Sequence, residues 1–203
     1  TADLVPMDKV IYALRDVTST VSSIPLIASS IMSKKIASGA DKILIDIKVG
    51  NGALLPTKEM AKELSDIMKR IGKVYDREVR TIISDMNTPL GTSVGNALEV
   101  LEAIDVLKNK ETDNSFVDLC YELASDMISM ALGVTKKDAF NMVFEAINSG
   151  KAYDKFLEMV RNQGGDVRRI SLAKKKVEII ASETGVLAKV SAIGVGELAL
   201  RLG

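Results

Sequence analysis

The sequence predicts an α/β protein in which a helical segment is followed by an α/β domain with a mostly parallel sheet and a β-rich hairpin region. Three observations support this fold class. The chain opens with helix-like patterns. A short β-branched run, Lys42–Val49, then introduces a strand–helix–strand order that is typical of parallel sheets. After Lys176 the residues alternate between apolar and polar in two short runs separated by a turn.

The residues up to about 38 are expected to form two helices. Pro6 starts the first, which runs to about Asp16 with Asp8 as its N-cap. The second starts at Ser23-Ile24-Pro25, and Gly39 ends it.

The next residues are expected to form a βαβ unit. Lys42–Val49 is closed by Gly-Asn-Gly and reads as a mostly buried strand. An amphipathic helix follows from Thr57, and a second buried strand is expected from Val79 to Asp85. Two consecutive strands joined by a long crossover pair in parallel.

The rest of the chain is expected to be helical and then β-rich. Thr135 with Asp138 resembles a capping box. A β-hairpin is predicted beyond Lys176, with a short helix from about Gly194. Four further helices are expected at about 95–107, 114–132, 136–149 and 151–163. We therefore expect a helical dimerisation domain at 1–38, an α/β domain at 39–166 and the start of a β-rich region at 167–203.

The composition narrows the class of function. The 203 residues contain 27 Lys+Arg and 27 Asp+Glu, so no charge excess indicates a nucleic-acid partner. The chain has no histidine, which excludes histidine acid–base catalysis and histidine metal ligands within it. The single cysteine and the lack of a long apolar run predict a soluble, cytoplasmic protein without a membrane partner.

A first candidate site lies on the second expected helix. Ser30 and Lys34 are four residues apart and share a face, with Ile27 one turn earlier. Arg15, near the end of the preceding helix, could add a forked donor. A helix face that presents an apolar contact, a hydroxyl and an ammonium suits a flat heterocycle with carbonyl and N–H groups. The alternative is a helix whose serine and lysine merely face water.

The segment around these residues resembles a known enzyme family. Tyr12–Thr18 reads Tyr-Ala-Leu-Arg-Asp-Val-Thr, and Ser23–Lys35 contains Ser-Ile-Pro-Leu-Ile and Ser-Lys-Lys. Both are similar to the signature of thymidine and pyrimidine nucleoside phosphorylases. The resemblance implies that the catalytic, base-binding residues are Arg15, Ser30 and Lys34. It also implies that the base is bordered by Tyr12, Val21, Ile27 and Leu54.

Two further segments fit the same family. Asp46–Ala53 resembles its Asp-x-Lys-Val-Gly-x-Gly-Ala run after a strand. Asp85–Gly91 and Asn96–Ala103 together resemble the stretch where bacterial members hold a potassium ion, which implies K⁺ ligands at the carbonyls of Leu90 and Ser93 and the carboxylate of Glu102. Hard oxygen ligands suit such a cation. Equally, Glu102 could lie on a solvated helix face.

The resemblance implies reversible phosphorolysis of pyrimidine nucleosides (thymidine, uridine and deoxyuridine), with phosphate as co-substrate, in a homodimer. The family's phosphate-binding segment is not in this chain, which opens at Thr1 rather than Met, so we expect a fragment that is inactive alone. Two alternatives stay open. One is an anthranilate phosphoribosyltransferase, which shares the architecture but not the Tyr-Ala-Leu-Arg-Asp motif, and the other is a non-catalytic binding or assembly fragment.

Overall fold

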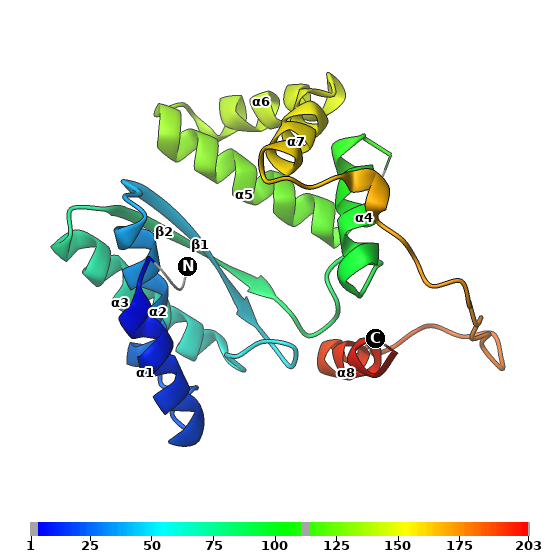
Figure 1. Ribbon diagram of the computed structural model, residues 1–203, viewed down its shortest axis with the longest axis horizontal. Helices are drawn as coiled ribbons and strands as arrows, with labels where there is room; N and C mark the ends of the chain where they lie inside the picture. The colour runs from blue at the N-terminus through cyan, green and yellow to red at the C-terminus, as the bar shows by residue number, and fades with distance from the viewer. Residues whose placement is uncertain (1–3, 111–113, 203) are drawn as a thin grey trace. The chain divides into compact units, whose positions relative to one another are not determined.

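The computed structural model describes residues 4–110 and 114–202 and divides them into two compact units (Figure 1). The first unit holds the described residues up to Asn87, and the second begins at Thr88. The first unit combines a two-stranded sheet with helices, whereas the regular elements described in the second are helical. The predicted α/β class is therefore confirmed. The opening residues 1–3, which prompted the expectation of a fragment, lie outside the described residues.

The first unit is built on the expected βαβ order. Its two strands pair in parallel, with Lys42 opposite Glu78 and Val49 opposite Asp85. The single helix between the strands supplies the crossover that parallel pairing requires. The elements are α1 (Pro6–Val17), α2 (Ile24–Ala37), β1 (Lys42–Val49), α3 (Lys58–Val74) and β2 (Glu78–Asp85).

A single apolar core joins α2, α3 and β1. Alternate residues of β1 enter it, as expected for a strand with one covered face. Side chains of α2, before residue 38, and of β1, after it, pack in this same core. The division into two compact units falls after Asn87. The domain boundaries expected after residues 38 and 166 remain predictions. The buried members of the core include Ala28, Met32, Ile43, Ile47, Leu64 and Met68.

The helix starts follow capping chemistry, with one correction. Thr57 accepts a hydrogen bond from the Met60 N–H at 3.3 Å. Thr135 accepts from the Asp138 N–H at 3.1 Å and donates to its carboxylate at 2.7 Å, as the predicted capping box requires. The prediction that Asp8 caps α1 was wrong. The N-cap is Val5, and Pro6 begins the helix because its missing N–H needs no partner there.

The second unit is a group of helices. Helix α5 packs against α6, and α7 contacts both α6 and α4. None of the helices among the described residues is long and apolar enough to cross a membrane. The helices are α4 (Asn96–Leu107), α5 (Ser115–Leu132), α6 (Lys136–Asn148), α7 (Lys151–Asn162), the 3-10 helix Val167–Arg169 and α8 (Ala192–Leu202).

The segment between the 3-10 helix and α8 departs from the prediction. We expected a β-hairpin there, but residues 170–191 contain no strand. Ile179 and Val186 are 92% and 93% exposed, so the alternating residues bury no face. An isolated two-stranded hairpin is at best marginally stable without a surface to cover. The alternation in the sequence is therefore not sufficient for strands within this chain.

Candidate functional site

The predicted face of α2 forms a polar cluster. The Lys34 ammonium lies 2.9 Å from the Ser30 hydroxyl and 3.0 Å from the Ser30 carbonyl oxygen, one helical turn away. Both residues are half-buried. The expectation that these two side chains share a face is confirmed, and neither of them simply faces water.

An acidic residue that sequence reasoning missed completes this cluster. The Asp8 carboxylate of α1 lies 2.5 Å from the Lys34 ammonium, and the Asp8 side chain is only 14% exposed. The hydrogen bond from Lys34 lowers the pKa of Asp8; burial opposes this, and Ser30 and the charges of Lys34 and Arg15 add to the lowering. Asp8 and Arg15 are seven residues apart, two helical turns, so their shared face was a usable signal.

Arg15 closes the connection between α1 and α2. The residue is 4% exposed, although it belongs to an otherwise unburied helix. Its guanidinium donates to the carbonyls of Thr20, Leu26 and Val21, and it lies 5.2 Å from the centre of the Tyr12 ring. Two of these carbonyls, those of Thr20 and Val21, lie in the turn, and that of Leu26 lies in the first turn of α2. Arg15 therefore ties the turn and the start of α2 to α1.

The four bordering residues occupy different environments. Tyr12 is 49% exposed and Leu54, in the turn after β1, is 54% exposed. Val21 is half-buried between α1 and α2. Ile27 is 6% exposed and belongs to the core shared with β1, so its side chain is directed inward. The structure thus brings Ser30, Lys34 and Asp8 into contact, and it places Arg15 on the same face of α1 as Asp8. The base site and its border remain predictions.

A second polar cluster lies on the sheet. The Lys48 ammonium is 2.5 Å from the Asp46 carboxylate and 3.0 Å from the Ser84 hydroxyl. That hydroxyl donates to the second carboxylate oxygen of Asp46 at 2.5 Å. Asp46 and Lys48 alternate with the core residues of β1 and therefore share its other face. The three side chains tie β1 to β2 near the ends of both strands.

The turns that follow the two strands are bonded to each other. The Asn51 N–H donates to the Asn87 side-chain oxygen at 3.1 Å, and the Gly52 N–H donates to the Met86 carbonyl at 3.0 Å. Gly50 has φ +131°, and a Cβ there would lie 2.7 Å from the Asn87 backbone nitrogen. The glycine of this turn is required by close backbone approach, as well as by its conformation.

Glu102, the carboxylate of the predicted cation site, is buried under the loop that precedes α4. It is 9% exposed and accepts from the Thr92 N–H and hydroxyl at 2.7 and 2.8 Å and from the Ser93 N–H at 3.1 Å. No ion pair among the described residues includes it. The alternative of a solvated helix face is therefore wrong for Glu102. The loop folds over this carboxylate, which a cation could share.

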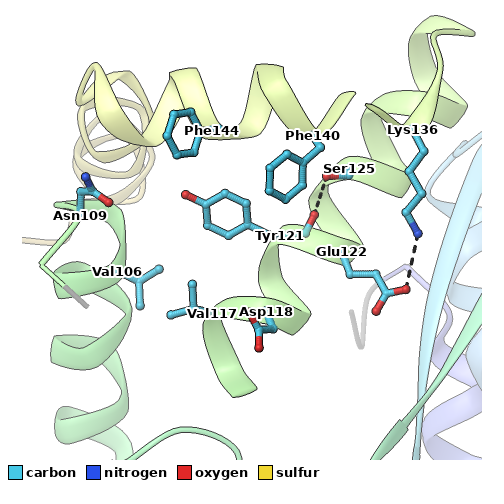
Figure 2. A pocket seen from close by; sticks show the side chains of 10 residues that line it. All are labelled: Val106, Asn109, Val117, Asp118, Tyr121, Glu122, Ser125, Lys136, Phe140 and Phe144. Carbon is cyan, nitrogen blue, oxygen red and sulfur yellow. Dashed lines mark hydrogen bonds and ion pairs between the residues drawn. The ribbon is translucent and has the colours of Figure 1, made fainter. Parts of the chain in front are cut away.

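A separate hollow lies within the second unit. A cavity of about 430 Å³ opens between α4, α5 and α6, and Figure 2 shows that aromatic rings face it. The rings of Tyr121 and Phe140 are 5.5 Å apart, and burial raises the pKa of the Tyr121 hydroxyl. Lys136 at its edge pairs with Glu122 and Asp126. The cavity is lined by none of the residues that the sequence singled out.

Comparison with known proteins gives one consistent family. Residues 1–153 match the family model described as "Glycosyl transferase family, a/b domain". Proteins named pyrimidine-nucleoside phosphorylase from Staphylococcus aureus strains USA300, COL and N315 are each 46% identical over 208 aligned residues, covering 99% of this chain. The alignment covers 48% of each relative, so the chain spans about half their length. The matched residues include both polar clusters and Glu102, and the chain belongs to the glycosyl transferase family that this a/b domain defines.

Proposed function

We propose that this chain supplies the pyrimidine-base site of a pyrimidine-nucleoside phosphorylase. The enzyme would convert thymidine, uridine or deoxyuridine and phosphate into the free base and a pentose 1-phosphate. The observation that carries the proposal is the bonding of Lys34 to Ser30 and to the Asp8 carboxylate at the junction of α1 and α2, with Arg15 on the same face of α1 as Asp8. The relatives named pyrimidine-nucleoside phosphorylase, at 46% identity, support the same reaction.

The chemistry requires a site that stabilises negative charge. Cleavage of the glycosidic bond leaves that charge on the departing base, while phosphate meets a sugar with oxocarbenium character. Arg15 carries a guanidinium and Lys34 an ammonium, so their bonds to the base carbonyls would strengthen as negative charge develops there. Ser30 can donate or accept and would orient the ring. Such differential binding of the transition state requires no covalent nucleophile.

A potassium ion near Glu102 forms part of the proposal. The Glu102 carboxylate is buried and, within the described part of the chain, accepts only from the uncharged donors of Thr92 and Ser93, and a cation beside it would add an opposite charge. The carbonyl oxygens of Leu90 and Ser93, in the same loop, are hard ligands of the kind such a cation prefers. A monovalent ion there would hold this loop.

The helical portion is proposed to build part of a homodimer interface in a cytoplasmic enzyme. The outer face of α1 carries apolar side chains at helical spacing that are 46–64% exposed, a pattern that marks interaction surfaces. Sedimentation of the full-length protein, meaning this chain within a protein of the relatives' length, should give a dimer. A clean monomer would contradict this part of the proposal. The exposed side chains are Met7, Val10, Ile11 and Leu14.

The test of the activity is release of uracil from uridine in the presence of phosphate. The full-length protein should release the base only when phosphate is present, and this chain alone should release none. Phosphate-independent hydrolysis would contradict the proposed reaction. No turnover of any pyrimidine nucleoside by the full-length protein would contradict the proposal and favour the binding or assembly alternative. Turnover of anthranilate with a phosphoribosyl donor would instead favour the other enzyme.

A further inference from the structure

Among the bonds that the structure describes for the Lys34 ammonium, only the one to Asp8 reaches a second helix. An ammonium has N–H groups for about three acceptors. In the structure these are the Asp8 carboxylate at 2.5 Å, the Ser30 hydroxyl at 2.9 Å and the Ser30 carbonyl at 3.0 Å. Two of the three acceptors belong to the helix of Lys34 itself. The direction of the ammonium relative to α1 therefore depends on Asp8.

Asp8 and Arg15 are seven residues apart on α1, so the Asp8 carboxylate lies on the side of the helix that also carries Arg15. Two cations that face one neutral base repel each other, and each disfavours the charge of the other. A carboxylate beside them offsets that repulsion without contacting the ligand. Asp8 is 14% exposed, so solvent screens this interaction only in part.

We propose that Asp8 is a positioning residue that holds the Lys34 ammonium toward α1, on the side of that helix that carries Arg15, for a pyrimidine base. The inference rests on the proposed function, because it assigns Asp8 a role in that same site. Asp8 touches neither the base nor the sugar in this account. It acts through Lys34.

The pattern of bonds indicates how a base would enter. The Lys34–Ser30 hydroxyl bond is the one that can be exchanged, because the base would offer a carbonyl to Lys34 while Ser30 turns to the ring. The Lys34–Asp8 bond stays in place during that exchange. It keeps the ammonium directed toward α1, so that Lys34 does not fold back along α2. Asp8→Asn retains the size of the side chain but removes the charge, so Lys34 would lose its anchor on α1.

The test measures uracil binding by chemical-shift perturbation in NMR titrations of this chain. The variants are Lys34→Met, Asp8→Asn, Asp8→Glu and the double variant, with Glu63→Gln on the exposed face of α3 as the matched carboxylate-to-amide control. We expect Lys34→Met and Asp8→Asn each to weaken uracil binding on the order of tenfold or more. Asp8→Glu should recover part of the affinity, and Glu63→Gln should bind like the unaltered chain.

The double variant separates positioning from a general structural role. If Asp8 acts through Lys34, Asp8→Asn should cause no further loss in the Lys34→Met background, whereas an independent structural effect would add. Unchanged binding by Asp8→Asn, or additive losses, would overturn the role of Asp8 while the proposed function stands. Equal binding by Lys34→Met and the unaltered chain, or no uracil binding at all, would overturn the base site and the inference with it. If Asp8→Asn does not fold, as seen by circular dichroism, Asp8→Glu decides: binding as weak as that of Lys34→Met would overturn the inference.

Discussion

Two clusters in the first unit contain the same three residue types and hold them at nearly the same distances. In the helical cluster, Lys34 is 2.5 Å from Asp8 and 2.9 Å from the Ser30 hydroxyl. In the sheet cluster, Lys48 is 2.5 Å from Asp46 and 3.0 Å from Ser84. The side chains of Lys34 and Lys48 are also similarly exposed, at 34% and 29%. The difference between the clusters lies in what fixes their positions.

Strand register fixes the sheet cluster, because Lys48 and Ser84 lie directly opposite each other in the parallel ladder. The helical cluster depends on the docking of α1, whose only buried residue is Arg15. A cluster held by register is part of the scaffold, whereas one held by a lightly buried helix can rearrange around a ligand. The same chemistry therefore serves structure in one place and, in our account, binding in the other.

The largest expected effect on stability is at Arg15, which anchors α1. Arg15→Leu removes three hydrogen bonds from a buried guanidinium to backbone carbonyls, and we expect a loss of about 3 kcal/mol in the free energy of unfolding. The measurement is urea denaturation followed by circular dichroism. Arg70→Leu on the exposed face of α3 is the control and should change little. A loss at Arg15 no larger than at Arg70 would show that α1 is held by other contacts.

Glu102 extends the comparison to a carboxylate that is held by uncharged donors. Gly91 has φ +76°, and a Cβ there would lie 2.8 Å from both Glu102 carboxylate oxygens. We expect Gly91→Ala to cost about 2 kcal/mol, from backbone strain together with displacement of the carboxylate. Gly150 has φ +77° with open space around it, so Gly150→Ala should cost only about 1 kcal/mol. Equal losses in thermal unfolding would indicate that the loop does not depend on Glu102.

The two serines test the contrast directly. Ser84 bridges both charged partners of its cluster, so Ser84→Ala should destabilise the chain by about 1 kcal/mol. Ser30→Ala leaves the Lys34–Asp8 bond and the Ser30 carbonyl bond intact, and it should cost less than about 0.5 kcal/mol. Denaturant midpoints of both variants provide the measurement. A larger loss at Ser30 would reverse the assignment of scaffold and binding roles.

The smallest expected effect is the pH dependence of the helical cluster. Bonding to Lys34 lowers the pKa of Asp8, so its contribution to stability is fully present above the ordinary carboxyl value of about 3.9 and is lost as the pH falls through the lowered pKa. Asp8→Asn should therefore be less stable than the unaltered chain at neutral pH, and the difference should shrink in acid. Urea denaturation at pH 7 and at successively lower pH tests this. If the stability difference between Asp8→Asn and the unaltered chain did not change with pH, the charge of Asp8 would contribute nothing to stability.

Local patterns in the sequence were sufficient to predict most of the helices and both strands. The strand Lys42–Val49 was predicted with the bounds that the structure gives, and the Thr135 capping box was found from spacing alone. Interactions that depend on packing were not predicted. The partnership of Asp8 with Lys34 joins residues 26 positions apart on different helices, and no local rule encodes it. The prediction of a hairpin was wrong for the same reason, because alternation favours strands only where a surface is available for them to cover.

The central claim is that the Lys34 face of α2 binds the base, and phosphorolysis kinetics in the full-length protein test it most directly. Lys35 is exposed and rotated about 100° around the helix, so it is the matched control. Lys34→Met should lower kcat/KM by about two to three decades, equivalent to roughly 2–4 kcal/mol, because a charge-assisted bond to developing charge is lost. Lys35→Met should leave kcat/KM nearly unchanged. Equal losses at both positions, or full activity in Lys34→Met, would contradict the account.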